Sequence, residues 1–114
     1  MPDPRTDLLQ GTLEMLVLKT LSLEPMHGWG ISLRLRDSSG DVFDVQQGSL
    51  YPALQRMLRR GWIKSEWRVT DNNRRARYYA LTREGSAVLA REIREWRRAS
   101  GAIEAVLTFA LAGA

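Results

Sequence analysis

The stretch VQQGSLYPALQRMLRRGWI, from Val45 to Ile63, decides the fold, because it contains a short amphipathic helix with a marked start and end. Ser49 is a favourable N-cap, since its hydroxyl can accept a hydrogen bond from an otherwise unpaired amide of the first turn. Pro52 falls within that turn, where no intrahelical N–H is required. Gly61 supplies the C-terminal stop. The sequence therefore predicts a helix that begins after Ser49 and ends at Gly61.

The two sides of this helix differ in character. About a third of its circumference is apolar and is expected to pack against the domain. This side is formed by Leu50, Leu54, Met57 and Leu58. The other side carries Pro52, Gln55, Arg56, Arg59 and Arg60. A helix fits the major groove of DNA, where glutamine and arginine make bidentate hydrogen bonds to base edges, so we expect the polar side to face DNA.

Four motifs occur in order along the chain: Met-His-Gly-Trp-Gly-Ile at 26–31, Gly-Ser-Leu-Tyr-Pro-Ala-Leu at 48–54, Gly-Trp-Ile at 61–63 and Arg-Arg-Ala-Arg-Tyr-Tyr-Ala-Leu-Thr at 74–82. Together they resemble the PadR family of winged helix-turn-helix transcriptional regulators. The resemblance implies a repressor that binds double-stranded DNA at a palindrome-like operator and is released by a small molecule. One position departs from the family pattern, since Trp29 stands where members usually carry tyrosine.

Positive charge is concentrated in one part of the chain. The formal net charge is +4 over 114 residues, a length that suits one domain. Between Gln55 and Arg77, eight basic residues stand against Glu66 and Asp71, which gives this segment a local charge of +6. A basic patch of this kind favours a polyanionic partner.

The residues needed for catalysis are scarce. Cysteine is absent and His27 is the only histidine. There is no glycine-rich phosphate loop, and the carboxylates are scattered rather than paired. We therefore expect no enzyme, no catalytic residue, no cofactor and no metal, and His27 is expected to cap a helix. No secretory leader is recognised at MPDPRTD, so a cytoplasmic protein without a membrane partner is expected.

The first helix is predicted from Leu8 to about Ser22, with Asp7 as its cap. It has two apolar stripes. One consists of Leu9, Leu13, Leu16 and Val17, and the other of Leu8, Met15 and Leu18. The second stripe needs a partner, which is either another subunit or a C-terminal helix of the same chain.

The remaining elements follow the order of a winged helix-turn-helix. A second helix is predicted from His27 to about Asp37, and a short strand from Val42 to Val45. Two further strands, 63–69 and 77–81, are joined by a loop with Asp71-Asn72-Asn73 at its tip, residues that tolerate positive φ. Period-2 alternation predicts that Ile63, Trp67, Tyr79 and Leu81 pack inward. The expected fold is mainly α with a small β-hairpin, the wing.

The wing carries an arginine cluster just past its tip. Arginines here can lie along phosphates or enter the minor groove, although a solvated hairpin is the alternative. The predicted DNA-binding residues are Gln47, Ser49, Tyr51, Pro52, Gln55, Arg56, Arg59, Arg60, Arg74, Arg75 and Arg77.

A long helix is expected after Thr82. It carries an a/d seam formed by Leu89, Ile93, Trp96, Ser100, Ile103, Leu107 and Ala110. Such a seam normally pairs with another helix, and a symmetric homodimer provides one. The predicted dimer interface comprises Leu8, Met15, Leu18, Leu89, Ile93, Trp96, Ile103 and Leu107. For Trp96, contact with a small aromatic effector and plain seam packing both stay open.

We expect residues 1–6 to form an N-terminal arm, 7–81 the winged helix-turn-helix domain and 82–114 the dimerisation helix. A sequence-specific DNA-binding regulator explains the helix, the wing, the charge and the seam together. The alternative is a winged-helix protein-interaction or dimerisation module without specific DNA binding, because basic residues alone show only affinity for polyanions.

Overall fold

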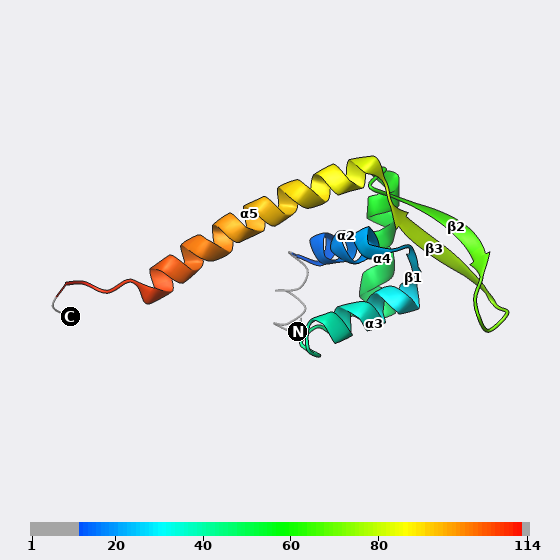
Figure 1. Ribbon diagram of the computed structural model, residues 1–114, viewed down its shortest axis with the longest axis horizontal. Coiled ribbons are helices and arrows are strands. Elements are labelled where there is room, and N and C mark those ends of the chain that lie inside the picture. Colours follow the sequence, from blue (N-terminus) through cyan, green and yellow to red (C-terminus); the bar gives the residue numbers. More distant parts are fainter. Residues whose placement is uncertain (1–11, 113–114) are drawn as a thin grey trace.

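The computed structural model describes residues 12–112. The elements in chain order are α2 (Leu13–Leu23), β1 (Met26–His27), α3 (Gly28–Ser38), α4 (Gln47–Arg59), β2 (Ile63–Val69), β3 (Arg75–Leu81) and α5 (Arg83–Thr108). The three strands form an antiparallel sheet in the order β1-β3-β2. In Figure 1, α2, α3 and α4 form one body, from which the β2–β3 hairpin and α5 project in opposite directions. The predicted class, mainly α with a small hairpin in winged-helix order, is confirmed.

Helix α4 ends as predicted but begins earlier. Gly61 has a φ of +77°. Its N–H donates to the Leu58 carbonyl, and the Trp62 N–H donates to the Met57 carbonyl, which is the glycine-terminated end that the sequence suggests. At the other end the helix starts at Gln47, so Ser49 lies inside it and the N-cap prediction is wrong. Pro52 consequently lies in the second turn.

Helix α3 begins at its predicted cap. The Nδ1 atom of His27 accepts a hydrogen bond of 3.0 Å from the Gly30 N–H, so the capping role is confirmed. The short strand predicted at Val42 to Val45 is wrong. Gly40 and Asp41 both have positive φ, so the chain leaves α3 in a turn instead of extending along the sheet. The place beside β3 is taken by β1, in which Met26 pairs with Tyr79.

The wing keeps its predicted strands with one shift, since β3 starts at Arg75 rather than Arg77. Asn73 at the tip has a φ of +58°, as its residue type suggests. Ile63 and Tyr79 are buried as expected, but Trp67 is 60% exposed, so its predicted inward packing is wrong. The reason is geometric, because the hairpin extends beyond the helices that cover its base (Figure 1).

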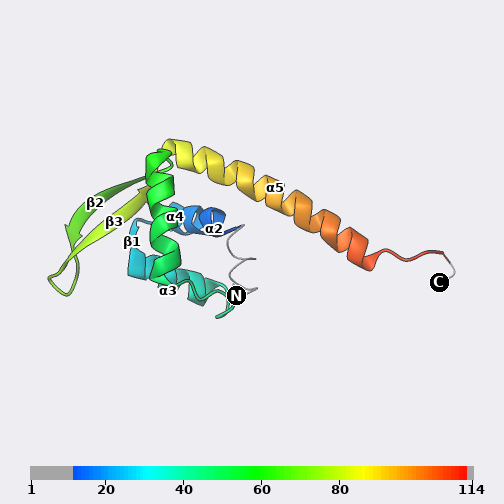
Figure 2. The same ribbon diagram turned by 180° about the vertical axis from the view of Figure 1, so that it is seen from behind.

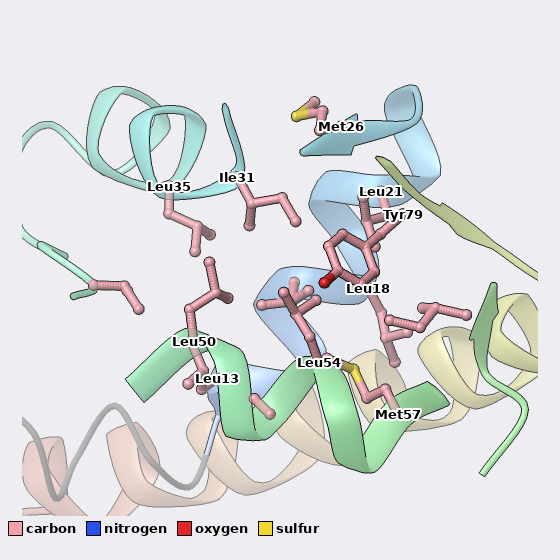
Figure 3. Close-up of a cluster of buried hydrophobic side chains, with 14 of the residues drawn as sticks. Leu13, Leu18, Leu21, Met26, Ile31, Leu35, Leu50, Leu54, Met57 and Tyr79 are labelled. Carbon is pink, nitrogen blue, oxygen red and sulfur yellow. The ribbon is translucent and has the colours of Figure 1, made fainter. Parts of the chain in front are cut away.

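The core lies between α2, α3, α4 and the sheet. Figure 3 shows side chains from these elements pointing toward one another, among them Ile31, Leu50, Leu54, Met57 and Tyr79. Each of these side chains is at most 1% exposed. Because α4 is fixed by its apolar side, its opposite side has to face outward.

The first turns of α5 belong to this core. Thr82 caps the helix, and its hydroxyl accepts a hydrogen bond of 3.0 Å from the Gly85 N–H. Leu89 is 7% exposed and Leu18 of α2 is 1% exposed. Since α5 packs on α2, the two described residues of the second stripe, Met15 and Leu18, are covered within the chain. Leu18 and Leu89 are therefore buried within the single chain and offer little surface to the predicted dimer interface.

The rest of the predicted interface divides into three groups. Met15 and Ile93 are partly buried against the core of the same chain. Trp96, Ile103 and Leu107 are 49%, 59% and 73% exposed on the distal part of α5. Leu8 lies outside the described residues, as do Asp7 and the N-terminal arm. Figures 1 and 2 show the distal part of α5 extending away from the winged body, and the molecule measures 66 × 31 × 25 Å.

Candidate nucleic-acid interface

Helix α4 presents one continuous outward side. Opposite its buried leucines lie Gly48, Tyr51, Pro52, Gln55 and Arg59, all of them exposed. The spacing of three and four residues places these positions on one side of the helix. Five of the predicted DNA-binding residues are exposed at or near this side: Ser49, Tyr51, Pro52, Gln55 and Arg59.

A groove separates this side of α4 from the wing. It has a volume of about 690 Å³ and lies between the start of α3, the first turns of α4 and the hairpin. Its walls include the exposed aromatic side chains Trp29, Tyr51 and Trp67. All three predicted wing arginines line it as well. The structure thus brings the wing cluster and the N-terminal half of α4 to one concave surface.

Two of these aromatic residues are not predicted from the sequence to lie on this surface. Trp67 was assigned to the core, and Trp29 was noted only as a departure from the family pattern. The available signal for Trp29 is its place as the second residue of α3, where a side chain opposite the buried Ile31 faces outward. No local signal distinguishes Trp67 from Ile63 on the same strand face.

The wing arginines differ in how they are held. The Nε of Arg77 donates a hydrogen bond of 2.9 Å to the Ser65 hydroxyl, which fixes this side chain across the hairpin. The Arg75 guanidinium lies 5.3 Å from the centre of the Trp67 ring, a cation–π arrangement that leaves its N–H groups available. Arg74 is exposed beside the tip. Arg74 and Arg75 are therefore the arginines best placed to meet a phosphate.

Gln47 lines the groove and is also hydrogen-bonded to another helix. Its Nε2 donates a hydrogen bond of 2.7 Å to the Ser32 hydroxyl, so its amide connects α4 to α3. A Cβ on Gly28 would lie 3.0 Å from the Gln47 Oε1, which explains why glycine suits this helix start. We conclude that Gln47 sets the position of α4 within the domain.

Arg56 and Arg60 lie at the edge of the outward side, next to α2. The Nε of Arg56 is 2.9 Å from Glu14 Oε1, and the Nη1 of Arg60 is 3.2 Å from Glu14 Oε2. The structure therefore groups these two predicted residues with a carboxylate of α2 rather than with the wing.

Tyr79 lies at the boundary between the groove and the core. Its side chain is 1% exposed, and its hydroxyl has no hydrogen-bond partner among the described residues. Burial raises the pKa of the Tyr79 phenol above its ordinary value, while the nearby Arg77 guanidinium opposes the rise.

Within residues 12–112, no group of three His, Cys, Asp or Glu side chains is arranged to hold a metal ion. In the same part of the chain, no helix combines the length and apolar character needed to cross a membrane.

Comparison with known proteins identifies this arrangement. Residues 17–91 match the sequence profile described as the transcriptional regulator PadR-like family. The chain belongs to the PadR-like family. It is a transcriptional regulator with a DNA-binding fold, and not an enzyme.

Several solved PadR-like and related structures share this fold. A PadR-like transcriptional regulator from Bacillus cereus is 28% identical, with a TM-score of 0.80 over 91% of this chain and 99% of that one. A PadR family regulator from Eggerthella lenta is 30% identical, with a TM-score of 0.79 over 92% of this chain and 89% of that one. A transcriptional regulator from Clostridium thermocellum is 26% identical, with a TM-score of 0.78 over 86% of this chain and 95% of that one.

Proposed function

We propose that this PadR-like protein is a homodimeric, sequence-specific repressor that binds a palindrome-like operator in the cytoplasm. The observation that carries the proposal is the outward side of α4, with Gln55 and Arg59 exposed next to a groove lined by the wing arginines. A helix with this composition suits the major groove, and an adjoining basic hairpin suits the phosphate backbone.

The two parts of the surface have different roles in this proposal. Gln55 and Arg59 contact base edges, and Tyr51 and Pro52 supply apolar contact in the groove. Arg74 and Arg75 contact phosphates, which position the protein without specifying the sequence. Arg77 is held by Ser65 and supports the hairpin from within the same cluster.

The distal part of α5 supplies the dimer contact. Trp96, Ile103 and Leu107 are exposed there, and Val106 beside them is 75% exposed. A second copy of the same helix covers such a stripe symmetrically. The working division is then a DNA-binding domain up to residue 81 and a dimerisation helix from residue 82, with its first turns built into the core.

Release by a small aromatic effector is the regulatory part of the proposal. Trp96 is 49% exposed on α5, three residues beyond Ile93, which still packs against the core. A flat indole in this position can stack on an aromatic ring, whereas it packs less closely than leucine in a helix seam. Quenching of Trp96 fluorescence by a bound effector, absent in Trp96→Phe, would support this role.

The competing candidate is a winged-helix module that binds a protein and lacks specific DNA binding. The two candidates predict different effects of replacing Gln55. The loss of DNA affinity depends on the DNA sequence only if Gln55 contacts bases. Fragments of genomic DNA selected by the protein would supply a preferred site for this comparison.

Gln55→Ala is expected to weaken binding to the selected site by about 1 to 3 kcal/mol and binding to random duplex hardly at all. The matched control is Gln46→Ala, which removes an exposed glutamine from the N-cap position of the same helix. Fluorescence anisotropy with both DNAs measures the difference. Equal losses on the two DNAs, or no enriched fragment at all, would favour the protein-interaction module.

A further inference from the structure

One carboxylate of α2 holds two arginines of α4. Glu14 accepts a hydrogen bond from each of them, from Arg56 at 2.9 Å and from Arg60 at 3.2 Å. The Glu14 side chain is 24% exposed, and those of Arg56 and Arg60 are 39% and 50% exposed. Both contacts join a charged donor to a charged acceptor, which makes them stronger than neutral hydrogen bonds.

This arrangement changes the charge that α4 presents. One carboxylate between two guanidinium groups leaves a local charge of +1 instead of +2, and it draws both side chains toward α2. The outward side keeps Gln55 and Arg59, which are exposed. Gln55 and Arg59 are therefore left accessible to bases. Arg56 and Arg60 beside them are held by Glu14.

We propose that Glu14 limits sequence-independent DNA binding by withholding Arg56 and Arg60 from phosphates. The inference rests on the proposed DNA-binding function. Attraction between arginine and phosphate strengthens binding to every sequence, so a carboxylate that holds both arginines lowers the affinity for random DNA. Glu14 acts through the arginines and is a positioning residue.

Glu14→Gln tests this role with the smallest change of shape. The amide oxygen still accepts a hydrogen bond, but the negative charge is lost. Binding to a random duplex is expected to become more sensitive to salt, by about 0.9 units of slope for each freed arginine that reaches a phosphate. At 0.1 M salt, each new contact between a freed arginine and a phosphate is expected to strengthen random-duplex binding by about eightfold. The salt concentration needed for elution from heparin is expected to rise as well.

Glu24→Gln is the matched control. Glu24 also lies next to α2 and pairs with an arginine of another helix, Arg34 of α3, at 3.0 Å. The substitution changes the net charge equally but frees no side chain of α4. Its random-duplex slope is expected to equal that of the unmodified protein.

Two further variants identify the freed side chain. In the unmodified background, Arg56→Gln is expected to leave the random-duplex slope unchanged, because Arg56 is already withheld. Added to Glu14→Gln, it is expected to remove about 0.9 units of the gained slope. If Glu14→Gln fails to fold, the single Arg56→Gln variant still tests the proposal. A flatter salt slope of random-duplex binding in this single variant would overturn the proposal.

A purely structural role for Glu14 predicts a different result. Loosening of α4 would lower the thermal unfolding midpoint and weaken DNA binding without making it more dependent on salt. Unchanged or weaker random-duplex binding by folded Glu14→Gln therefore overturns the inference. If the unmodified protein shows no salt-dependent binding, the DNA-binding function itself fails.

Discussion

Gly85 is the residue at which the long helix touches the end of α4 most closely. It is buried, and a Cβ at this position would lie 1.9 Å from the Trp62 carbonyl oxygen. The Thr82 hydroxyl donates to the Gly61 carbonyl at 2.7 Å beside it. The backbone at residues 61–62 therefore leaves no room for a side chain at position 85.

Gly85→Ala is expected to destabilise the protein by about 3 kcal/mol or more, because a backbone atom has to move. Gly101→Ala is the control in the same helix, since a Cβ there meets nothing within 4 Å. That change is expected to stabilise by up to about 1 kcal/mol through helix propensity. Urea unfolding measures both variants. A Gly85→Ala variant as stable as the parent would contradict the close contact.

Tyr79 carries a buried hydroxyl without a partner among the described residues. Removal of an unsatisfied polar atom releases its desolvation penalty, so Tyr79→Phe is expected to keep or raise stability, by about 1 kcal/mol. Tyr78→Phe is the control, because Tyr78 is only partly buried and its ring contacts His27. A clear loss of stability in Tyr79→Phe would show that the hydroxyl is bonded in solution.

The same hydroxyl gives a pH dependence. Burial raises the pKa of Tyr79 in the folded state, so the neutral phenol is favoured by folding. This contribution to stability is complete below about pH 10, the ordinary tyrosine pKa, and is lost as pH rises through the folded-state pKa. The alkaline decline in the free energy of unfolding is therefore expected to be smaller in Tyr79→Phe than in the unmodified protein.

Residue-level predictions succeeded where the cause is local. The positive φ of Gly61 and the capping by His27 depend on one or two turns of chain, and both are visible in the sequence. Ser49 and Trp67 failed because distant contacts decide them. The Gln47 bond to Ser32 fixes an earlier start for α4, and the reach of the hairpin beyond the helices exposes Trp67.

At the scale of elements, periodicity identified α4 and the wing, whereas the small strand was misplaced. The two residues of β1 form a strand only because β3 lies beside them. A segment this short has no pattern of its own. The outward side of α4 followed from the sequence, but the contact of Arg56 and Arg60 with Glu14 joins residues more than 40 positions apart and could not be predicted.

The wing is expected to contribute binding that does not depend on sequence. Replacing Arg74 and Arg75 together by alanine should flatten the salt dependence by up to about four units per dimer, or less if a tip arginine enters the minor groove. Arg97 and Arg98, exposed on α5, are the control pair. An unaltered slope after loss of both wing arginines would exclude the hairpin as a phosphate contact.

At the scale of the whole molecule, α5 has two roles that its heptad pattern does not separate. The seam repeats evenly from Leu89 onward, yet its first positions complete the core and only the later ones are exposed. A hydrophobic repeat indicates that one side of a helix is covered. It does not tell whether the covering residues belong to the same chain or to a second one. This ambiguity explains why Leu89 was assigned to the dimer interface.

Replacing Ile103 and Leu107 by aspartate is expected to convert a dimer into a folded monomer. Both side chains are exposed in the single chain, so the substitutions should affect association and leave the winged core intact. Ile93 is unsuitable because it packs against that core. Val42→Asp, at an apolar residue that is 69% exposed outside α5, is the control. Light scattering at micromolar concentration measures the mass. A monomeric parent protein, or a dimeric double variant, would refute the interface.

Because α5 runs without interruption from Arg83 to Thr108, it also acts as a rigid lever between the two ends of the molecule. The part beyond Ile93 is about 23 Å long at 1.5 Å per residue, so a tilt of about 10° displaces its end by roughly 4 Å. In a dimer joined at these ends, a tilt of each helix shifts the two copies of α4 by a similar distance, which is close to the rise of one base pair, about 3.4 Å. A ligand that tilts α5 by about 10° would thus put the two halves of the protein out of step with a fixed DNA spacing.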